Sequence, residues 1–311
     1  FAVSVIVIIS MIHLGRISRI AGFQCSFTSA KLILIVVLGI LGFALGSKQD
    51  ISFLPRPGDS DLIFSADFGI SFVYVLYAYA GWNAATYMID EVRNPAKTVP
   101  VAILTGTALV TVVYLFVNAA FLYSTPVSDL AGEAEAGLIA SKAILGERGG
   151  NAMGLIIAFG LISTISSMTW AGPRVTAVIG QDYPVFRRFA QLNKNGVPAT
   201  AVIFQSLIAV ILILTATFDE LIHYIQALLT ISSIGVVVGM VWLRIRQPGL
   251  KRPFKAWGYP VTPLLFLICT FGVLYFQVQQ KTTECLWGVV TLLIGAVIHR
   301  FASRTAKEEG L

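Results

Sequence analysis

The sequence predicts an all-α integral membrane protein with about nine transmembrane helices. Hydrophobic residues make up 56% of its 311 residues and charged residues 12%, whereas a soluble domain carries about 25% charged residues. Apolar runs of membrane-spanning length recur along the whole chain, and Lys and Arg gather in alternate breaks between them. A soluble protein is excluded, because a soluble fold cannot hide this much apolar surface from water.

The apolar runs are continuous rather than alternating, which predicts helices and excludes barrel strands. The first run is too short for a full span of about 20 residues, so the sequence is expected to begin inside a truncated helix. The whole chain, residues 1–311, is expected to form a single transmembrane domain, with a short surface helix over residues 131–146. The expected spans are 1–15, 27–46, 67–90, 100–124, 151–179, 199–217, 220–245, 261–279 and 284–302.

The positive residues predict the orientation of the chain in the membrane. Fifteen Lys and Arg residues lie in one set of alternate loops and the C-terminal tail, and five lie in the opposite loops. The other two, Lys31 and Arg174, lie within or at the edge of apolar runs. Because positive loops face the cytoplasm, we expect a cytoplasmic C-terminus in a plasma or bacterial inner membrane. The net charge of +6 therefore reflects topology and does not indicate a nucleic-acid surface.

No motif in the sequence indicates a reaction, a cofactor or a metal site. The three cysteines are isolated, which predicts neither a metal centre nor a disulfide framework. A nucleotide-binding loop, a nucleophile elbow and a zinc-protease motif are all absent from the sequence. His13, His223 and His299 lie near the ends of apolar runs and are expected at the membrane interface. We therefore expect no enzyme activity, no cofactor and no bound metal.

The third apolar run contains the segment that carries the most chemical information, residues 77–83 (YAYAGWN). A helix that is interrupted near the membrane midplane frees backbone N–H and C=O groups, which can then coordinate a substrate. Gly81 relaxes the backbone there and Asn83 adds hydrogen-bond donors and an acceptor. The bulky residues Tyr77, Tyr79 and Trp82 can close over a ligand. The alternative is that the small and polar residues only allow close helix packing.

Lys31 and the hydroxyl-rich part of the fifth apolar run are further candidates for functional residues. Lys31 lies inside the second apolar run, where an ammonium must pair, bind carbonyls or lose its proton. It is a candidate proton carrier, or alternatively a lysine that snorkels to the cytoplasmic interface. The hydroxyls of the fifth run can line a polar cavity, coordinate a cation or pack against a neighbouring helix. These hydroxyl residues are Ser163, Thr164, Ser166, Ser167 and Thr169, and Pro173 is expected to bend or end the run.

Charged residues follow the third run and the fifth run on the side expected to be cytoplasmic. Glu91 and Arg93 end the third run as an interfacial charge cluster, and Arg174 follows the hydroxyl-rich segment. These three residues are candidates for a cytoplasmic gate.

Residues 77–100, YAYAGWNAATYMIDEVRNPAKTVP, are similar to the sixth-helix signature of the amino acid–polyamine–organocation permeases. The segment IHLGRISRIAGFQCSFTSAKL resembles the junction of that family's fourth and fifth helices, and Lys31 falls on its embedded lysine. The hydroxyl-rich run resembles the eighth helix. The resemblance covers essentially the whole chain and is strongest in the branch of L-type exchangers and bacterial proton-coupled permeases. The signature is met by Tyr79, Gly81, Trp82, Asn83, Glu91, Arg93, Asn94, Pro95 and Pro100.

The resemblance implies a LeuT-like transporter fold, a five-plus-five inverted repeat with two further helices. On this mapping helices four to twelve are present and helices one to three are missing, together with the half of the binding site that the first helix supplies. The implied function is secondary active transport of amino acids by alternating access, through proton-coupled symport or exchange. Lys31 stands where sodium-coupled relatives bind a cation, near residues 163–167. The implied substrate-binding residues are Tyr77 (an aromatic gate), Tyr79, Ala80, Gly81, Trp82 and Asn83.

Two other functional classes remain open at this point: a channel, and a non-transporting receptor or scaffold subunit. A channel would need a ring of charges or a carbonyl filter, which the sequence does not display. The expected partners are an amino-acid substrate, protons and the lipid bilayer, with no nucleic acid. The substrate's side chain, the choice between symport and exchange, the oligomeric state and any accessory subunit are not specified by the sequence.

Overall fold

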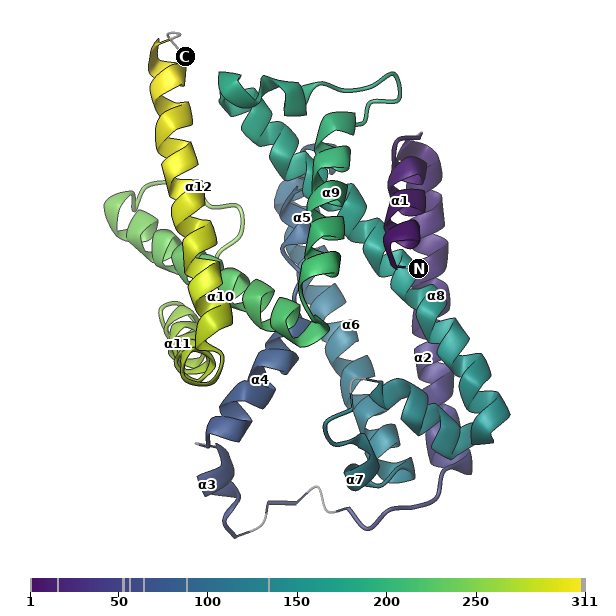
Figure 1. Cartoon of the computed structure of the whole chain (residues 1–311). Coiled ribbons are helices and arrows are strands. Elements are labelled where there is room, and N and C mark those ends of the chain that lie inside the picture. The colour runs from purple at the N-terminus through teal and green to yellow at the C-terminus, as the bar shows by residue number, and fades with distance from the viewer. Residues whose placement is uncertain are drawn as a thin grey trace. The chain divides into compact units, whose positions relative to one another are not determined.

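The computed structural model describes residues 2–15, 17–51, 54–55, 57–63, 65–87, 89–133 and 135–308. Helices and turns make up this part of the chain, and no strand occurs in it, which confirms the predicted all-α class. The helices, drawn in Figure 1, are α1 (Ala2–His13), α2 (Ile17–Leu45), α3 (Asp59–Ile63), α4 (Ala66–Ala78), α5 (Ala84–Tyr87), α6 (Pro95–Ser124), α7 (Val127–Leu130), α8 (Ala136–Asp182), α9 (Ala199–Thr215), α10 (Phe218–Arg246), α11 (Val261–Gln280) and α12 (Thr282–Glu308). Short 3-10 helices cover Ile89–Glu91 and Pro184–Ala190.

Within these residues, 6 helices are long and apolar enough to cross a membrane, namely α2, α6, α8, α10, α11 and α12. Three of the predicted spans coincide with the shorter apolar helices α1, α4 and α9. That these three also cross the membrane stays a prediction, as does the single transmembrane domain.

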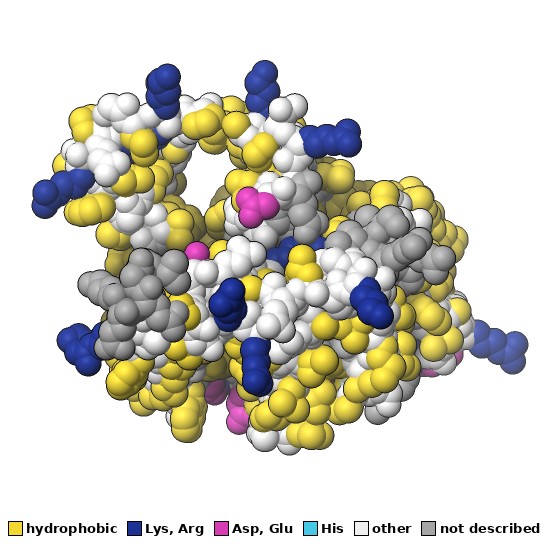
Figure 2. Space-filling model, turned by 90° about the horizontal axis from the view of Figure 1, so that it is seen from above, with side chains coloured by type: hydrophobic (Ala, Val, Ile, Leu, Met, Phe, Trp, Pro, Cys, Tyr) yellow, Lys and Arg dark blue, Asp and Glu magenta, His cyan; other side chains and the backbone are white. Residues whose placement is uncertain are grey.

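Large apolar side chains remain on the surface of the long helices. Leu115 is 68% exposed, and Leu214 and Ile245 are each 72% exposed. Figure 2 shows hydrophobic side chains spread over much of one face, with separate Lys and Arg side chains between them. Water would penalise such a surface, whereas the hydrocarbon core of a bilayer is as apolar as these side chains. The surface therefore fits a protein surrounded by lipid.

The chain divides into two compact units, which are described separately. The first comprises Phe1–Pro55, Ala102–Ile179 and Arg188–Val210, and the second comprises Arg56–Val101, Gly180–Arg187 and Ile211–Leu311.

In the first unit, α2 and α6 approach each other closely along a line of glycines. A Cβ atom at Gly39 would lie 2.3 Å from the Phe116 ring, and one at Gly46, just after α2, would lie 2.3 Å from the Ser124 side chain. Small residues at such positions let two helices in a membrane pack closely. The pairs along this line are Gly39 with Phe116, Gly42 with Ala120 and Gly46 with Ser124.

The helix α8 of the first unit differs in two ways from the predicted run. It begins at Ala136 and kinks at Gly146, where φ is 71° and ψ is 175°. Its first segment, residues 136–145, corresponds to the predicted surface helix, and Ile144 on it is part of the hydrophobic core. Pro173 does not end the run, because α8 continues to Asp182.

In the second unit, α10 contacts α4, α11 and α12, and α4 also contacts α11 (Figure 1). Gly69 allows the last contact, since a Cβ atom there would lie 2.4 Å from the Phe276 ring of α11. The start of α10 is fixed by a capping box, in which Thr217 accepts a hydrogen bond from the Glu220 backbone N–H and Glu220 accepts one from the backbone N–H of Thr217. This packing positions α10 and α11 beside the part of α4 that carries the candidate site.

Candidate functional site

The third predicted run is a broken helix. Helix α4 ends at Ala78, and the chain passes through a turn before α5 begins at Ala84. Gly81 lies in this turn with φ at 99°, a left-handed conformation that glycine adopts without a steric penalty. The structure therefore places a helix interruption at the glycine where the sequence predicted one.

A cavity of about 230 Å³ lies against this interruption, and we call it the break cavity. Five of the six predicted substrate-binding residues line it, whereas Tyr77 does not. Leu76 of α4 and several polar and apolar residues of α10 and α11 complete the lining, and sequence analysis did not single out any of them. The full lining is Leu76, Tyr79, Ala80, Gly81, Trp82, Asn83, Gln226, Leu229, Thr230, Ser233, Phe266 and Thr270.

Gln226 is a buried polar residue of the break cavity. Its side chain is 5% exposed, and its Nε2 donates a hydrogen bond to the Thr230 hydroxyl at 3.2 Å. Its Oε1 has no hydrogen-bond partner among the described residues. By contrast, the amide of Asn83 donates to the Tyr87 hydroxyl at 2.6 Å, and the Thr270 hydroxyl donates to the Phe266 carbonyl at 2.6 Å.

Lys31 lies at a separate cavity within the first unit. This cavity of about 350 Å³ is lined mainly by apolar residues of α2, α6 and α8. The Lys31 ammonium donates a hydrogen bond to the Thr164 hydroxyl at 3.3 Å. Gly160 makes room for the lysine stem, since a Cβ atom there would lie 3.3 Å from Lys31 Cδ. In the part of the chain that the structure describes, no carboxylate lies within 4.0 Å of this ammonium.

Gly160 was not identified from the sequence, although a signal for it exists. It precedes Thr164 by four residues, and residues at that spacing share one face of a helix. Both therefore face the lysine.

The other predicted coupling hydroxyls have different partners. The Ser163 hydroxyl lies 3.4 Å from that of Thr28, and the Ser166 hydroxyl lies 2.8 Å from His13 Nε2. The Ser167 hydroxyl donates to the Ser163 carbonyl at 3.1 Å. Thr164 is thus the residue of this group that the structure brings to Lys31, while Ser163 and Ser166 join α8 to α2 and α1.

Two of the histidines expected at the membrane interface are buried against other helices. His13 is 2% exposed and His223 is 0% exposed. Their partners come from other helices: Ser166 of α8 for His13 and Tyr74 of α4 for His223. That both histidines lie at the depth of the membrane interface stays a prediction.

The three predicted gate residues are placed as follows. Arg174 donates a hydrogen bond to the Trp170 carbonyl and lies over the Trp170 ring, 5.1 Å from its centroid. Arg93 is exposed, and its carbonyl accepts a hydrogen bond from Thr98 at 2.9 Å. Glu91 ends a 3-10 helix, and its side chain lies outside the described residues. A gate formed by these residues stays a prediction.

A polar cluster around Asp219 joins three helices of the second unit, and sequence analysis missed it. The Asp219 carboxylate accepts hydrogen bonds from the Tyr74 hydroxyl and the Lys281 ammonium, each at 2.5 Å. His223 Nε2 lies 3.3 Å from the Tyr74 hydroxyl. The bond from its ammonium to Asp219 raises the pKa of Lys281 above its ordinary value, so this lysine stays charged at neutral pH. We call Tyr74, Asp219, His223 and Lys281 the Asp219 cluster.

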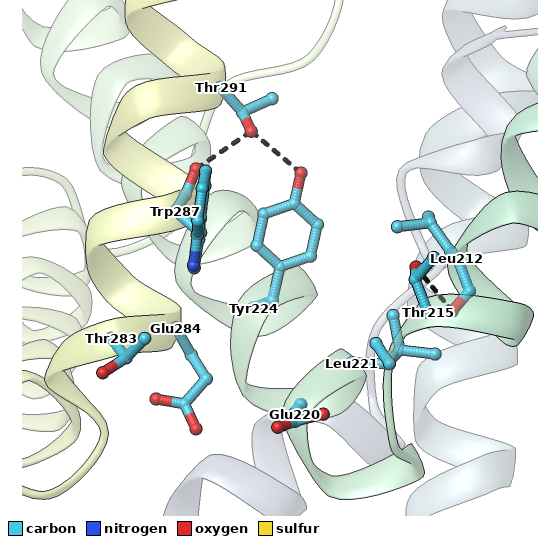
Figure 3. Close-up of a pocket in the computed structure, with 10 residues that line it drawn as sticks. Leu212, Thr215, Glu220, Leu221, Tyr224, Thr283, Glu284, Trp287 and Thr291 are labelled. Atoms are coloured by element: carbon cyan, nitrogen blue, oxygen red, sulfur yellow. Dashed lines mark hydrogen bonds between the residues drawn. The ribbon is translucent and has the colours of Figure 1, made fainter.

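A third cavity, shown in Figure 3, lies between the end of α9, α10 and α12, with a volume of about 450 Å³. The Tyr224 ring lies beside Trp287, and the Thr291 hydroxyl is 2.9 Å from the Tyr224 hydroxyl. Glu220 and Glu284 add two carboxylates to the lining. None of the predicted site residues lines this cavity, so the break cavity is the better candidate for the functional site.

Sequence comparisons agree with this geometry. A family model described as amino acid permease matches residues 1–298. The chain is 26% identical over 278 residues to b(0,+)-type amino acid transporter 1 of Rattus norvegicus, a match that covers 89% of this chain and 56% of the relative. It is 24% identical over 292 residues to the cystine/glutamate transporter of Homo sapiens, covering 93% and 57%. It is 25% identical over 287 residues to the serine/threonine exchanger SteT of Bacillus subtilis, covering 91% and 64%.

The chain thus spans little more than half the length of the first of these relatives. All three are named as transporters or exchangers, and none is named as an enzyme. Long apolar helices, a helix interrupted beside a cavity and a family match over nearly all residues lead to one conclusion. The chain belongs to the amino acid permease family.

Proposed function

We propose that the protein to which this chain belongs is a secondary active transporter that moves amino acids across a cell membrane by alternating access. The observation that carries this proposal is the break in the helix at Gly81, which lies beside a cavity in a chain of the permease family. A broken helix offers its freed backbone groups to a substrate within the membrane. The names of the three relatives, all of which refer to amino acids, support the substrate class.

The break also suggests how an amino acid is held. The C-terminal end of α4 carries the partial negative charge of a helix terminus, which favours the substrate's ammonium group. Tyr79, Ala80, Gly81, Trp82 and Asn83 are the proposed binding residues, and Tyr77 is the proposed aromatic gate.

We further propose that Lys31 couples proton movement to transport, by symport or during exchange. Its ammonium has a hydroxyl partner, Thr164, and no described carboxylate within reach. An ammonium in an apolar segment without a counter-charge can release its proton. Ser163, Ser166 and Ser167 belong to the same stretch of α8 and are proposed to support the polar surroundings of this lysine.

The proposed topology follows from the distribution of positive residues. Fifteen Lys and Arg residues against five predict a cytoplasmic C-terminus in a plasma or inner membrane. Glu91, Arg93 and Arg174 then belong to the cytoplasmic side, where they are proposed to form a gate.

Uptake of radiolabelled amino acids into proteoliposomes that contain the complete gene product tests the proposal. We expect accumulation that an imposed pH gradient increases in the wild type and that Lys31→Ala abolishes. Lys48→Ala, a change at an exposed lysine after α2, is the matched control and should leave the gradient effect intact. Exchange that ignores the gradient would remove Lys31 from coupling, and failure to take up any amino acid would overturn the transport proposal.

A further inference from the structure

We propose that the loop between α10 and α11, residues 247–260, binds the headgroup of an anionic phospholipid together with Arg246 at the end of α10. Arg246, Lys251 and Lys255 are the proposed ligands of the headgroup phosphate, and the Trp257 ring is proposed to anchor the loop in the lipid. The inference requires only that the chain lies in a bilayer and goes beyond the proposed transport.

The segment around this loop concentrates positive charge. Five of the fifteen Lys and Arg residues on the side expected to be cytoplasmic fall within residues 244–255. Residues 221–283 contain no Asp or Glu, so the adjoining parts of α10 and α11 offer them no carboxylate. A cluster of roughly four to eight positive residues directly after a transmembrane helix is typical of proteins that bind anionic lipids. The bias of positive loops toward the cytoplasm explains the side of these residues, but not their gathering in one short segment.

Two of the five positive residues fix the shape of the loop. The Arg252 guanidinium donates hydrogen bonds of 2.8–3.2 Å to three carbonyls of residues 247–250. Arg244 Cζ lies 4.0 Å from the centroid of the Tyr259 ring, a cation–π contact that joins the start of the segment to its end. All these contacts come from residues 244–259, so the segment itself holds the loop in its conformation.

The other three positive residues have no counter-charge. Arg246, Lys251 and Lys255 are exposed, and none of them forms a hydrogen bond or an ion pair with a described residue. Arg246 Cζ lies 5.8 Å from the centroid of the Trp242 ring, which is neutral and leaves the positive charge uncompensated. A guanidinium binds a phosphate as a fork and an ammonium binds it as a point charge. The loop therefore supplies the donors that an anionic headgroup requires.

The loop also exposes large apolar side chains. Trp257 is 72% exposed, Leu250 47% and Phe254 44%, and the ring centroids of Phe254 and Trp257 are 6.1 Å apart. Water penalises such a group of side chains, whereas Trp is enriched at the boundary between headgroups and hydrocarbon. Positive and aromatic side chains on one loop fit a lipid, because a soluble phosphate compound would leave the rings in water.

Lipid binding by the complete gene product in a neutral detergent tests the proposal. Dioctanoyl phosphatidylglycerol is titrated by microscale thermophoresis, in parallel with dioctanoyl phosphatidylcholine, which has the same chains but no net charge. We expect the Kd for phosphatidylglycerol to be at least about tenfold lower, since each positive residue near an anionic surface contributes roughly fivefold. An increase in salt from about 0.05 M to about 0.5 M should reduce this preference, because salt screens exposed charges.

A triple variant assigns the binding to the loop. Its substitutions are Arg246→Gln, Lys251→Gln and Lys255→Gln. The Kd for phosphatidylglycerol should rise at least about tenfold, while the Kd for phosphatidylcholine should stay the same. Trp257→Ala should weaken the binding of both lipids, because the ring contacts the part that they share. An unchanged Kd for phosphatidylglycerol in the triple variant would overturn the assignment.

A matched control removes three exposed positive residues from the connection between α8 and α9, on the same expected side of the membrane. In that connection Phe189 packs against Phe204, with ring centroids 5.1 Å apart, and is less exposed than Trp257. The control should raise the Kd for phosphatidylglycerol by less than about twofold, since we expect no headgroup to bind there. Its substitutions are Arg187→Gln, Arg188→Gln and Lys194→Gln. An equal rise in both triple variants would show that binding follows net charge and would overturn the site.

Glycerol phosphate distinguishes a lipid from a soluble phosphate compound. It has the phosphate but no chains, and we expect it to leave the bound phosphatidylglycerol in place when both are present at the same concentration. Displacement under these conditions would overturn the assignment to lipid.

The wild type keeps the inference testable if the triple variant does not fold. Equal affinity of the wild type for the two lipids would overturn the inference. None of these measurements involves the movement of an amino acid, so their failure would leave the transport proposal standing, and a failure of uptake would leave the lipid site standing.

Discussion

Two partly buried lysines, one in each unit, have opposite surroundings. Lys281, between α11 and α12, donates a hydrogen bond to the Asp219 carboxylate at 2.5 Å. Lys31, within α2, donates one to the Thr164 hydroxyl at 3.3 Å and has no described carboxylate within 4.0 Å. Among the described residues, the charge of Lys281 is compensated by a carboxylate and that of Lys31 is not.

The difference fits a structural role for Lys281 and the coupling role that we propose for Lys31. A compensated ion pair that joins helices contributes to stability and keeps its lysine protonated. An uncompensated ammonium contributes little to stability and can change its protonation state, which is what a proton-coupled transporter requires. Four substitutions test this comparison, in order of decreasing expected effect.

The largest effect is expected for Asp219→Ala, which removes the acceptor of two hydrogen bonds and leaves Lys281 without a carboxylate. The free energy of unfolding should fall by about 2 kcal/mol, less than for a fully buried pair because the Asp219 side chain is 46% exposed. Thermal or denaturant unfolding in detergent measures it. The exposed Asp50 serves as control, and Asp50→Ala should change stability by less than about 0.5 kcal/mol. Equal effects of the two substitutions would mean that the Asp219 cluster is not a stabilising contact.

The next effect is expected for Thr164→Asp, which gives Lys31 the kind of partner that Lys281 has. A carboxylate beside the ammonium favours the charged lysine, so the proton would no longer be released during transport. Accumulation driven by a pH gradient should fall at least about tenfold, equivalent to roughly 1.4 kcal/mol. Thr164→Val removes the hydroxyl without adding charge and should have a smaller effect. Gradient-driven uptake that survives Thr164→Asp would argue against coupling through Lys31.

Lys281→Met should destabilise the protein by about 1 kcal/mol, whereas Lys31→Met should not. Because the pKa of Lys281 is raised in the folded protein, its contribution is fully present below the ordinary value of 10.5 and is lost as the pH rises through the folded value. The stability difference between the wild type and Lys281→Met should therefore stay constant between about pH 7 and about pH 9. Unfolding measured at both pH values checks this. A comparable loss of stability for Lys31→Met would contradict the contrast between the two lysines.

The smallest effect is expected for Gly160→Ala beside Lys31. The added Cβ would lie 3.3 Å from Lys31 Cδ, so the lysine stem must shift slightly. Gly106→Ala on α6 meets no atom within 4 Å and should gain about 0.5–1 kcal/mol from helix propensity. The gain in unfolding free energy for Gly160→Ala should be smaller than the gain for Gly106→Ala by a few tenths of a kcal/mol in the same assay. An equal gain would show that the lysine stem is not confined by α8.

Local features of the sequence were sufficient to predict most of the fold and part of the site. The helix break could be predicted because Gly81 and Asn83 are unusual within an apolar run. Each residue acts on the backbone of a few neighbours, so a local pattern is enough to reveal the break. The contact between Lys31 and residues of α8 followed from the family resemblance. The start of α2, ten residues earlier than expected, was missed because polar and charged residues interrupt the apolar residues of its first turns.

The remainder of the site depends on how helices rotate about their axes and pack. Gln226 and Thr270 are among several polar residues of largely apolar helices, and the sequence does not tell which neighbour each one faces. Asp219 and Lys281 are 62 residues apart, and their pairing requires α10 to pack against the junction of α11 and α12. Such contacts follow from tertiary structure, which no local pattern encodes.

The glycine line between α2 and α6 has a consequence for how related sequences can vary. Phe116 fills the space that Gly39 leaves, and a Cβ atom at Gly39 would overlap its ring at 2.3 Å. A larger residue at position 39 is therefore compatible with this packing only if position 116 becomes smaller. Members of the family should therefore substitute positions 39 and 116 together. Covariation between these two positions would then indicate that α2 and α6 pack closely.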